Sequence, residues 1–465
     1  MLSTRQVMAL TSKTARTASF PSSINHVMAP MVAASDYPFR CLLRQHGVDL
    51  CFTQMMHAKN LVNDKQFRKT HLDLLEFLPS PPPPLLLPQQ ERFLQGSRIL
   101  LTPDDERTKF TRGPLIAQLA GHDVDAVVQA AAVLMESSQG QLTGIDLNLG
   151  CPQHIARKGH YGAFIMEDDP QRVYDILTAL STYMAESYPQ TMVSAKIRLP
   201  LDDSTLAERI PRLIQTGISF LTIHGRTLHE NKTKVRACHV DRMTKAIQTA
   251  RAVQPDFPVI ANGGIETYDD VIAIQQQTDA TAVMSSEALL ETPNVFMSSS
   301  SSSKAPPQVI FQQQFQFAHD YLDWCTRYPP LPGVLGNHGS LCICRGHLFK
   351  FLHRYLQEHP DLRDALGSPK LTTCVQLRDI VDTLQSRYDD DTVWSVLSSQ
   401  PNASWYRRHR DALERVHTRR GGATPIAVQA LLSVPEKKAL LRTRIAKLQQ
   451  QNKEKAMSSS SSSVL

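Results

Sequence analysis

The feature that most constrains the fold is a repeated alternation of short apolar segments with helical stretches between residues 26 and 296. Candidate strands cover residues 27–30, 50–53, 115–119, 144–149, 193–199, 220–224, 258–261 and 282–284. Helical periodicity fills most of the intervals, at 123–137, 171–188, 205–216, 241–253 and 269–276. Eight such units predict an α/β fold of the (β/α)₈ TIM barrel type, with a doubly wound open sheet as the alternative.

Changes in composition divide the rest of the chain around this barrel, which we expect over residues 26–297. A Pro-rich insertion at 79–90 contains four consecutive prolines, and its run through Pro88 is expected to form neither helix nor central strand. An all-Ser stretch at 298–303 indicates a linker over 298–307. Helical patterns at 308–328, 345–357 and 375–388 predict a small helical domain within 308–400.

The two ends of the chain differ from its centre in charge. Residues 1–25 contain three basic residues and no acid, which is typical of a disordered terminus and also of an organelle transit peptide, so cytoplasm, nucleus, mitochondrion and plastid all stay open. Residues 401–465 hold thirteen Lys and Arg against four Asp and Glu, a local charge of +9, so residues 1–400 carry −3 of the total +6. This basic tail predicts binding to a polyanion.

Composition argues against two further classes of protein. No run of about eighteen apolar residues occurs, so we expect no membrane span. The eight cysteines are scattered without Cys-x-x-Cys spacing, which indicates reduced thiols rather than a disulfide framework or a zinc site. We therefore expect a monomer that holds no metal.

Polar residues on the predicted strands mark the candidate site. Asp146 and Asn148 share one face of their strand, which runs directly into Gly150, Cys151 and Pro152. A strand end followed by a glycine and a thiol is typical of the C-terminal rim of a parallel barrel, where active sites lie. Cys151 is therefore the candidate catalytic residue.

The same polar spacing recurs on other strands. Lys196 and Arg198 lie two residues apart, as do His224 and Arg226, and Gln118 lies within a further strand. Each polar group turned into a barrel costs roughly 2–7 kcal/mol if it has no hydrogen bond. This many polar groups at one rim imply a polar ligand.

The last two predicted strands indicate that this ligand carries a phosphate. The seventh strand ends at Asn262, Gly263 and Gly264, and the eighth is followed by Ser286 and Glu287. Loops after strands seven and eight form the usual phosphate site of TIM barrels, and glycines let backbone N–H groups come close to a bound group. We infer a phosphorylated cofactor.

Taken in order, these motifs resemble those of the flavin-dependent tRNA-dihydrouridine synthases. The resemblance covers roughly residues 26–296, with a weaker match at 345–350. Its motifs are Ala29-Pro30-Met31, Ala117-Gln118-Leu119, the segments 146–153 and 159–163, Lys196-Ile197-Arg198, the segment 224–227 and the segment 262–265. The segments 146–153 and 159–163 look most like the eukaryotic subgroup that modifies uridines 16 and 17 of the D-loop.

The resemblance implies a barrel that binds FMN, a helical domain that holds tRNA, and reduction of the uracil 5,6 double bond with NADPH or NADH as reductant. It implies that reduced flavin delivers hydride to C6 and that Cys151 protonates C5. A thiol with a pKa near ~8.5 is mostly protonated at neutral pH, which suits a general acid.

The resemblance also implies roles for the other rim residues. Those implied to contact the cofactor are Pro30, Met31, Gln118, Lys196, His224, Asn262, Gly263, Gly264, Ser286 and Glu287. Those implied to contact the substrate are Asn148, Arg198 and Arg226. The segment 228–239 lacks the glycine and tryptophan that commonly follow in relatives, so the loop over the substrate departs from the family pattern.

Two other functions stay open at this point. A flavin-dependent TIM-barrel oxidoreductase that acts on a free pyrimidine explains the barrel and its site, but it gives no role to the helical domain or the basic tail. A non-catalytic RNA-binding protein on a barrel scaffold would tolerate loss of Cys151 and of the flavin-binding residues, and all of them are present.

Overall fold

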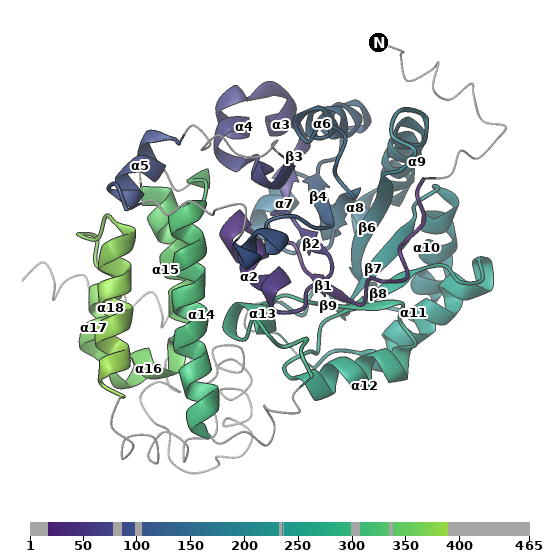
Figure 1. The fold of residues 1–465 in the computed structure, drawn as a ribbon. Coiled ribbons are helices and arrows are strands. Elements are labelled where there is room, and N and C mark those ends of the chain that lie inside the picture. The colour runs from purple at the N-terminus through teal and green to yellow at the C-terminus, as the bar shows by residue number, and fades with distance from the viewer. Residues whose placement is uncertain are drawn as a thin grey trace, which may run out of the picture. The chain divides into compact units, whose positions relative to one another are not determined.

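The computed structural model describes residues 17–77, 86–97, 105–231, 235, 237–298, 307–333 and 338–388 (Figure 1). The chain separates into two compact units, residues 1–406 and 407–465, and every described residue belongs to the first. The predicted basic tail at 401–465 and most of the predicted linker at 298–307 lie outside the described residues.

In the described part of the chain, nine parallel strands form one sheet that curves into a nearly closed barrel. They are β1 His26–Met28, β2 Cys51–Phe52, β3 Met56–His57, β4 Leu115–Ala120, β5 Gly144–Leu149, β6 Met192–Leu199, β7 Phe220–Thr227, β8 Val259–Asn262 and β9 Ala282–Ser285. The spatial order is β1-β9-β8-β7-β6-β5-β4-β2, and β3 also pairs with β4. A parallel bridge from Val27 to Leu50 brings β1 back to the start of β2. The predicted barrel and its eight strands are confirmed, and the open sheet is excluded because its outer strands meet.

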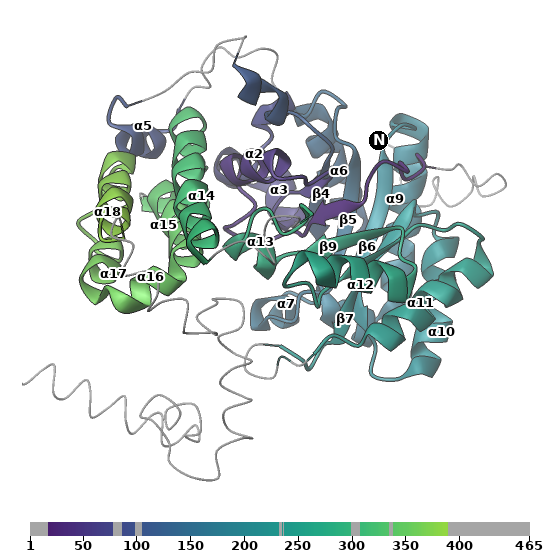
Figure 2. The same cartoon turned by 60° about the horizontal axis from the view of Figure 1, so that its bottom comes forward.

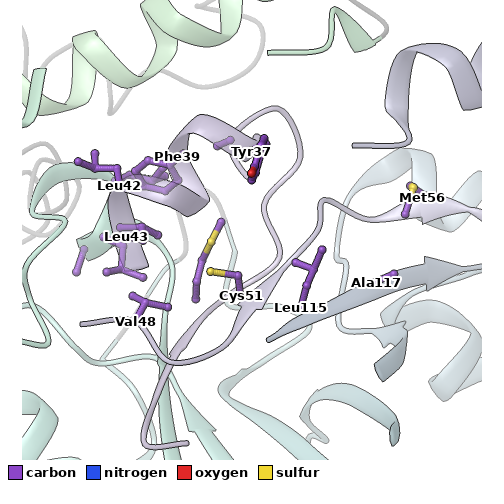
Figure 3. Close-up of a cluster of buried hydrophobic side chains, with 14 of the residues drawn as sticks. Tyr37, Phe39, Leu42, Leu43, Val48, Cys51, Met56, Leu115 and Ala117 are labelled. Carbon is purple, nitrogen blue, oxygen red and sulfur yellow. The ribbon is translucent and has the colours of Figure 1, made fainter. Parts of the chain in front are cut away.

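Helices cover the outside of this barrel. The five helices that the sequence predicted are present as α6 Val124–Ser137, α9 Pro170–Ser187, α10 Asp203–Gln215, α11 Val240–Val253 and α12 Tyr268–Thr278. Shorter helices are α2 Tyr37–Gln45, α3 Ala58–Asn63, α4 Lys65–His71, α7 His154–Lys158, α8 Ala163–Asp168 and α13 Glu287–Glu291. Figure 3 shows part of the layer between helices and strands, where Leu43 of α2 gathers with Cys51 of β2 and Leu115 of β4.

The inside of the barrel is apolar at one end and polar at the other. Inward-facing residues near the strand starts, such as Val27, Ile116 and Phe220, form one buried cluster. Phe20 and Ile24 join this cluster, and the Phe20 ring lies 5.0 Å from that of Phe220. Residues 17–25, which the sequence placed in a terminal segment outside the barrel, thus close its bottom because their apolar side chains cover the interior.

The helical domain contains α14 Pro307–Arg327, α15 Gly339–Phe351, α16 His353–Glu358, α17 Pro360–Leu366 and α18 Cys374–Ser386 (Figure 1). The helix predicted at 345–357 is in fact the end of α15 followed by α16. Helix α17 was not predicted from the sequence. None of the helices in the described ranges is both long and apolar enough to cross a membrane.

The Pro-rich insertion adds a helix to this domain. The expectation that its run through Pro88 forms no helix is wrong at the last residue, because α5 (Pro88–Leu94) begins there. Proline is tolerated at the first turn of a helix, where its missing N–H would have no partner. Gln90 Nε2 donates to the carbonyl of Pro329 at 2.6 Å, which ties α5 to the segment after α14.

A buried carboxylate joins the helical domain to the barrel. Asp36, at the start of α2, accepts hydrogen bonds from the Tyr321 hydroxyl at 2.9 Å and from His347 Nε2 at 2.8 Å. Burial alone would raise the pKa of Asp36, but His347 holds it below its ordinary value. The Phe39 ring lies 4.3 Å from the His347 ring, so the polar contact sits within an aromatic cluster.

We predict that Asp36→Ala lowers the free energy of unfolding by about 3 kcal/mol, because it leaves the buried donors of Tyr321 and His347 without an acceptor. Chemical denaturation followed by tryptophan fluorescence measures the change. Asp364→Ala is the control, since this helical-domain carboxylate is largely exposed and its loss should cost less than about 0.5 kcal/mol. Equal losses in the two variants would contradict the prediction.

Candidate functional site

The sheet register places the predicted site residues in rows at the C-terminal end of the barrel. Asn148 lies opposite Lys196 on the neighbouring strand. Arg198 lies opposite His224, which in turn lies opposite Asn262. These side chains alternate with residues that pack against the outer helices, so they face inward above the apolar cluster.

A chain of hydrogen bonds crosses three strands one row below this rim. The Ser194 hydroxyl donates to Asp146 Oδ1 at 2.7 Å, and Gln118 Nε2 donates to Asp146 Oδ2 at 2.8 Å. Asn148 Nδ2 then donates to Gln118 Oε1 at 2.8 Å. Burial raises the pKa of Asp146 to about 6, against the effect of these donors. The chain fixes the orientation of both side-chain amides.

Asn148 extends this chain of hydrogen bonds to the loop that carries the Cys151 thiol. Its Oδ1 accepts from the backbone N–H groups of Gly150 at 3.2 Å and Cys151 at 3.0 Å. Gly162 packs against the same loop with φ of 68°, and a Cβ at that position would lie 2.8 Å from the Cys151 carbonyl oxygen. A residue with a side chain would therefore displace the loop.

The Cys151 side chain packs in a small cluster with apolar neighbours. The cluster contains Met55, Ala120, Ala156, Tyr161 and Phe164. Burial raises the pKa of the Cys151 thiol, while the backbone N–H of Gln153 and the charge of Arg198 oppose that rise. The thiol therefore keeps its proton at neutral pH.

Two cations from β6 lie at the rim beside this loop. Lys196 Nζ donates to Asn262 Oδ1 at 2.8 Å, and burial lowers the pKa of Lys196 to about 8. Arg198 Nε donates to the carbonyl of Gly150 at 2.8 Å and its Nη1 to that of Thr227 at 3.0 Å. Burial, with Arg226 nearby, lowers the pKa of Arg198 to about 10.

His224 is neutral among these charges. Burial, followed by Arg198, Lys196 and Arg226, lowers its pKa well below the ordinary value. The Arg226 guanidinium lies 3.3 Å from His224 Nε2, so Nε2 accepts and the ring proton is on Nδ1. Gly263 comes close to the same ring, and a Cβ there would lie 3.0 Å from His224 Cδ2.

A cavity of about 380 Å³ opens at this rim. Its lining residues are Pro152, Gln153, Arg198, His224, Arg226, Glu230, Asn231, Val235, Gly263, Ile265, Ser285, Ser286 and Glu287. Six predicted site residues thus face one space, and the two residues after Cys151 border it. The guanidinium groups of Arg198 and Arg226 and the hydroxyls of Ser285 and Ser286 fit an anionic ligand such as a phosphorylated cofactor.

The other predicted site residues, Cys151 included, do not line this cavity. Gln118, Asn148, Lys196 and Asn262 are engaged in the hydrogen bonds given above, and their expected contacts with cofactor or substrate stay predictions. Pro30 and Met31 follow β1 and are half-buried, and Gly264 follows Gly263 with φ of 80°. No group of three or more His, Cys, Asp or Glu side chains in the described ranges is arranged to hold a metal ion.

Some residues of the site were not predicted. Glu230 lines the cavity and accepts from the backbone N–H of Thr227 at 2.8 Å and from His239 Nε2 at 2.9 Å. It belongs to the segment 228–239, whose pattern gave no signal for a site. Ser194, which donates to Asp146, was not predicted because nothing distinguishes it from other residues of its strand. Its position two residues before Lys196 places it on the same face, which is the signal that could have identified it.

We predict that Asn148→Ala raises the alkylation rate of Cys151 by iodoacetamide about tenfold, because the loss of two hydrogen bonds loosens the loop by about 1.4 kcal/mol. Mass spectrometry of the peptide that contains Cys151 measures the rate. Asn60→Ala, which removes an exposed amide on α3, should leave the rate unchanged. An unaltered rate in Asn148→Ala would show that Asn148 does not hold the loop.

Comparison with known proteins supports the sequence resemblance. A family model described as dihydrouridine synthase (Dus) matches residues 27–80 and 89–363. A mouse protein named tRNA-dihydrouridine(16/17) synthase NAD(P)(+)-like is 32% identical over 366 residues, which make up 79% of this chain and 62% of that protein. A Schizosaccharomyces pombe tRNA-dihydrouridine(16/17) synthase is 29% identical over 344 residues, or 73% of this chain and 72% of that protein. The chain therefore matches somewhat under two thirds of the length of the mouse relative.

Similarity to solved structures is lower. A 2-naphthoyl-CoA reductase complex matches with a TM-score of 0.39 and 9% sequence identity over 58% of this chain and 49% of that one. At this level the match adds nothing to the barrel topology described above.

Proposed function

We propose that this chain, which belongs to the dihydrouridine synthase family, reduces uridine to 5,6-dihydrouridine in the D-loop of tRNA with NADPH or NADH as the reductant. The observation that carries the proposal is that the Cys151 loop, held by Asn148, runs directly into Pro152 and Gln153, which line a cavity together with Arg198, His224 and Arg226. Names of relatives that specify positions 16 and 17 support the D-loop as the target.

FMN is the proposed cofactor, because the donors at the cavity fit an anion and the glycines allow a close approach. The residues proposed to hold its ring are Pro30, Met31, Gln118, Lys196, His224 and Asn262. Those proposed to hold its phosphate are Gly263, Gly264, Ser286 and Glu287. When bound and reduced, FMN supplies the hydride that reaches uracil C6.

Cys151 is proposed to act as the general acid. Its S–H bond breaks, the proton forms a C–H bond at uracil C5, and the electron pair stays on sulfur as a thiolate. Arg198 stabilises that thiolate, since its charge already opposes the rise in the pKa of the thiol. Asn148 keeps the loop in place during the transfer.

The substrate contacts are proposed for Asn148, Arg198 and Arg226 at the rim. A uracil within folded tRNA must be unstacked before it can enter, which costs a few kcal/mol. We assign the compensating backbone contacts to the helical domain and the basic tail at 401–465, because shape and phosphate charge dominate recognition of folded RNA.

The visible spectrum of the purified protein tests the function directly. A flavin band that bleaches with NADPH and returns on addition of unmodified tRNA is the expected result. Return of the band with free uracil or uridine instead would favour an enzyme of free pyrimidines. A protein that binds tRNA but no flavin would contradict the proposal.

We predict that Cys151→Ala lowers dihydrouridine formation by a factor of about 10²–10⁴, the usual contribution of a general acid, and leaves flavin content and tRNA affinity unchanged. Mass spectrometry of digested tRNA measures the product. Cys342→Ala, which changes a half-buried thiol of the helical domain, is the control and should retain full activity. Unchanged turnover in Cys151→Ala would rule out the acid role.

The pH dependence of the protonation step provides a separate prediction. Because burial raises the pKa of the Cys151 thiol above the ordinary value for a cysteine, the thiol stays protonated through neutral and mildly alkaline pH. Loss of this proton should therefore lower the rate with an inflection above pH 9, separate from any change near pH 8 that comes from Lys196. Stopped-flow reoxidation of the reduced flavin by tRNA measures the profile, and an inflection below pH 8 would contradict the assignment.

A further inference from the structure

Helix α7 (His154–Lys158) begins three residues after Cys151 and turns most of its side chains toward solvent. Ala156 anchors it against Ala120 and Tyr161 in the buried cluster that also contains Cys151. The exposed side chains are His154, Ile155, Arg157 and Lys158, with Ile155 exposed to 64%. Figure 2 draws the helix at the lower edge of the barrel.

The positive charges of α7 are not neutralised by the barrel. In the described ranges, no carboxylate lies within ion-pair distance of Arg157 or Lys158, although Arg157 lies over the Phe164 ring at 6.0 Å. On the outer helices, by contrast, Arg209 pairs with Glu167 at 2.8 Å. Unpaired cations next to a cavity attract a polyanion.

The helix is coupled to the cavity through the segment that joins it to the thiol. The carbonyl of Gln153 accepts from the backbone N–H groups of Ala156 at 3.0 Å and Arg157 at 3.2 Å. Pro152 and Gln153 themselves line the cavity. The lining of the cavity therefore continues directly into the first residue of α7.

We propose that α7 holds the RNA strand on either side of the nucleotide that enters the cavity, an inference that rests on the proposed function. Arg157 and Lys158 bind phosphates that flank this nucleotide. Ile155 packs against the neighbouring base and occupies part of the space left by the unstacked uracil, as apolar side chains do where proteins separate stacked bases. The surface thus lowers the cost of unstacking at the point where the thiol acts.

The chemistry of this surface favours RNA over an acidic protein segment. A large apolar side chain followed by two cations on the same short helix matches a strand that offers charged phosphates and apolar base faces within a few ångströms. An acidic peptide would use the cations but would gain little from Ile155. A site for an acidic peptide would leave both the tRNA affinity and the rate of flavin reoxidation by tRNA unchanged in the α7 variants.

The test compares three variants of the full-length, flavin-loaded protein with unmodified tRNA. Arg157→Ala with Lys158→Ala should weaken tRNA binding about tenfold at low salt and reduce the slope of log affinity against log salt by about 1.5, because two phosphate contacts are lost. Ile155→Ala should leave the affinity within about twofold and slow the reoxidation of reduced flavin by tRNA about fivefold, because only unstacking is impaired. Fluorescence anisotropy and stopped-flow absorbance measure the two effects.

The matched control is Arg209→Ala with Lys245→Ala, which removes two cations from the outer helices that are paired with Glu167 and Asp203. This variant should keep the affinity and the salt slope. Reduction of the flavin by NADPH should be unchanged in all variants, which excludes misfolding. Equal loss of affinity in control and α7 variants, or full reoxidation rates in Ile155→Ala, would overturn the proposal.

Flavin reoxidation by tRNA in the unaltered protein distinguishes failure of this proposal from failure of the proposed function. Absence of tRNA-dependent reoxidation there contradicts the function, while the affinity measurements still test α7. Normal reoxidation in the unaltered protein, with no change in the α7 variants, contradicts the α7 proposal alone.

Discussion

The two hydrogen bonds that Asn148 Oδ1 accepts from the backbone of Gly150 and Cys151 are the constraint on which the site depends. A loop that carries a reactive group has few packing contacts of its own, so its position must come from the scaffold. Here the scaffold supplies it through Gln118 and Asp146, which lie on two neighbouring strands. The barrel thereby fixes the loop through side chains, in addition to the close packing of Gly162 and of the apolar cluster around Cys151.

These hydrogen bonds can hold the loop because the barrel interior is divided into an apolar half and a polar half. Apolar residues such as Phe220 fill the lower half, and Phe20 closes it from below. The hydrogen bonds of the upper half therefore lie at a low dielectric, which strengthens them and makes each unmet partner costly. The same environment raises the pKa of Cys151 and lowers that of His224, so both groups are uncharged where cations surround them.

The sequence allowed the barrel, its eight strands and the position of Cys151 to be predicted, because alternation of apolar residues reports which face of a strand is buried. It did not reveal that Gln118 and Asn148 bond to each other, since alternation gives a facing direction and no partner. The pairing of Asp36 with His347 joins residues 311 positions apart and carries no local pattern. Helix α5 was missed for a different reason, because a proline run masks a helix that begins at its last proline.

The charge pattern of the described surface favours an anionic ligand at the site. Cations on the outer helices, such as Lys245, pair with carboxylates, so they add little field at a distance. At the rim, Arg198 lines the cavity and donates to the backbone carbonyls of Gly150 and Thr227, which carry no net charge. An anionic strand that approaches the barrel therefore gains most where the cavity opens. Because Arg198 is hydrogen-bonded to neutral carbonyls, its charge attracts an anion to this rim more than the paired cations of the outer helices do.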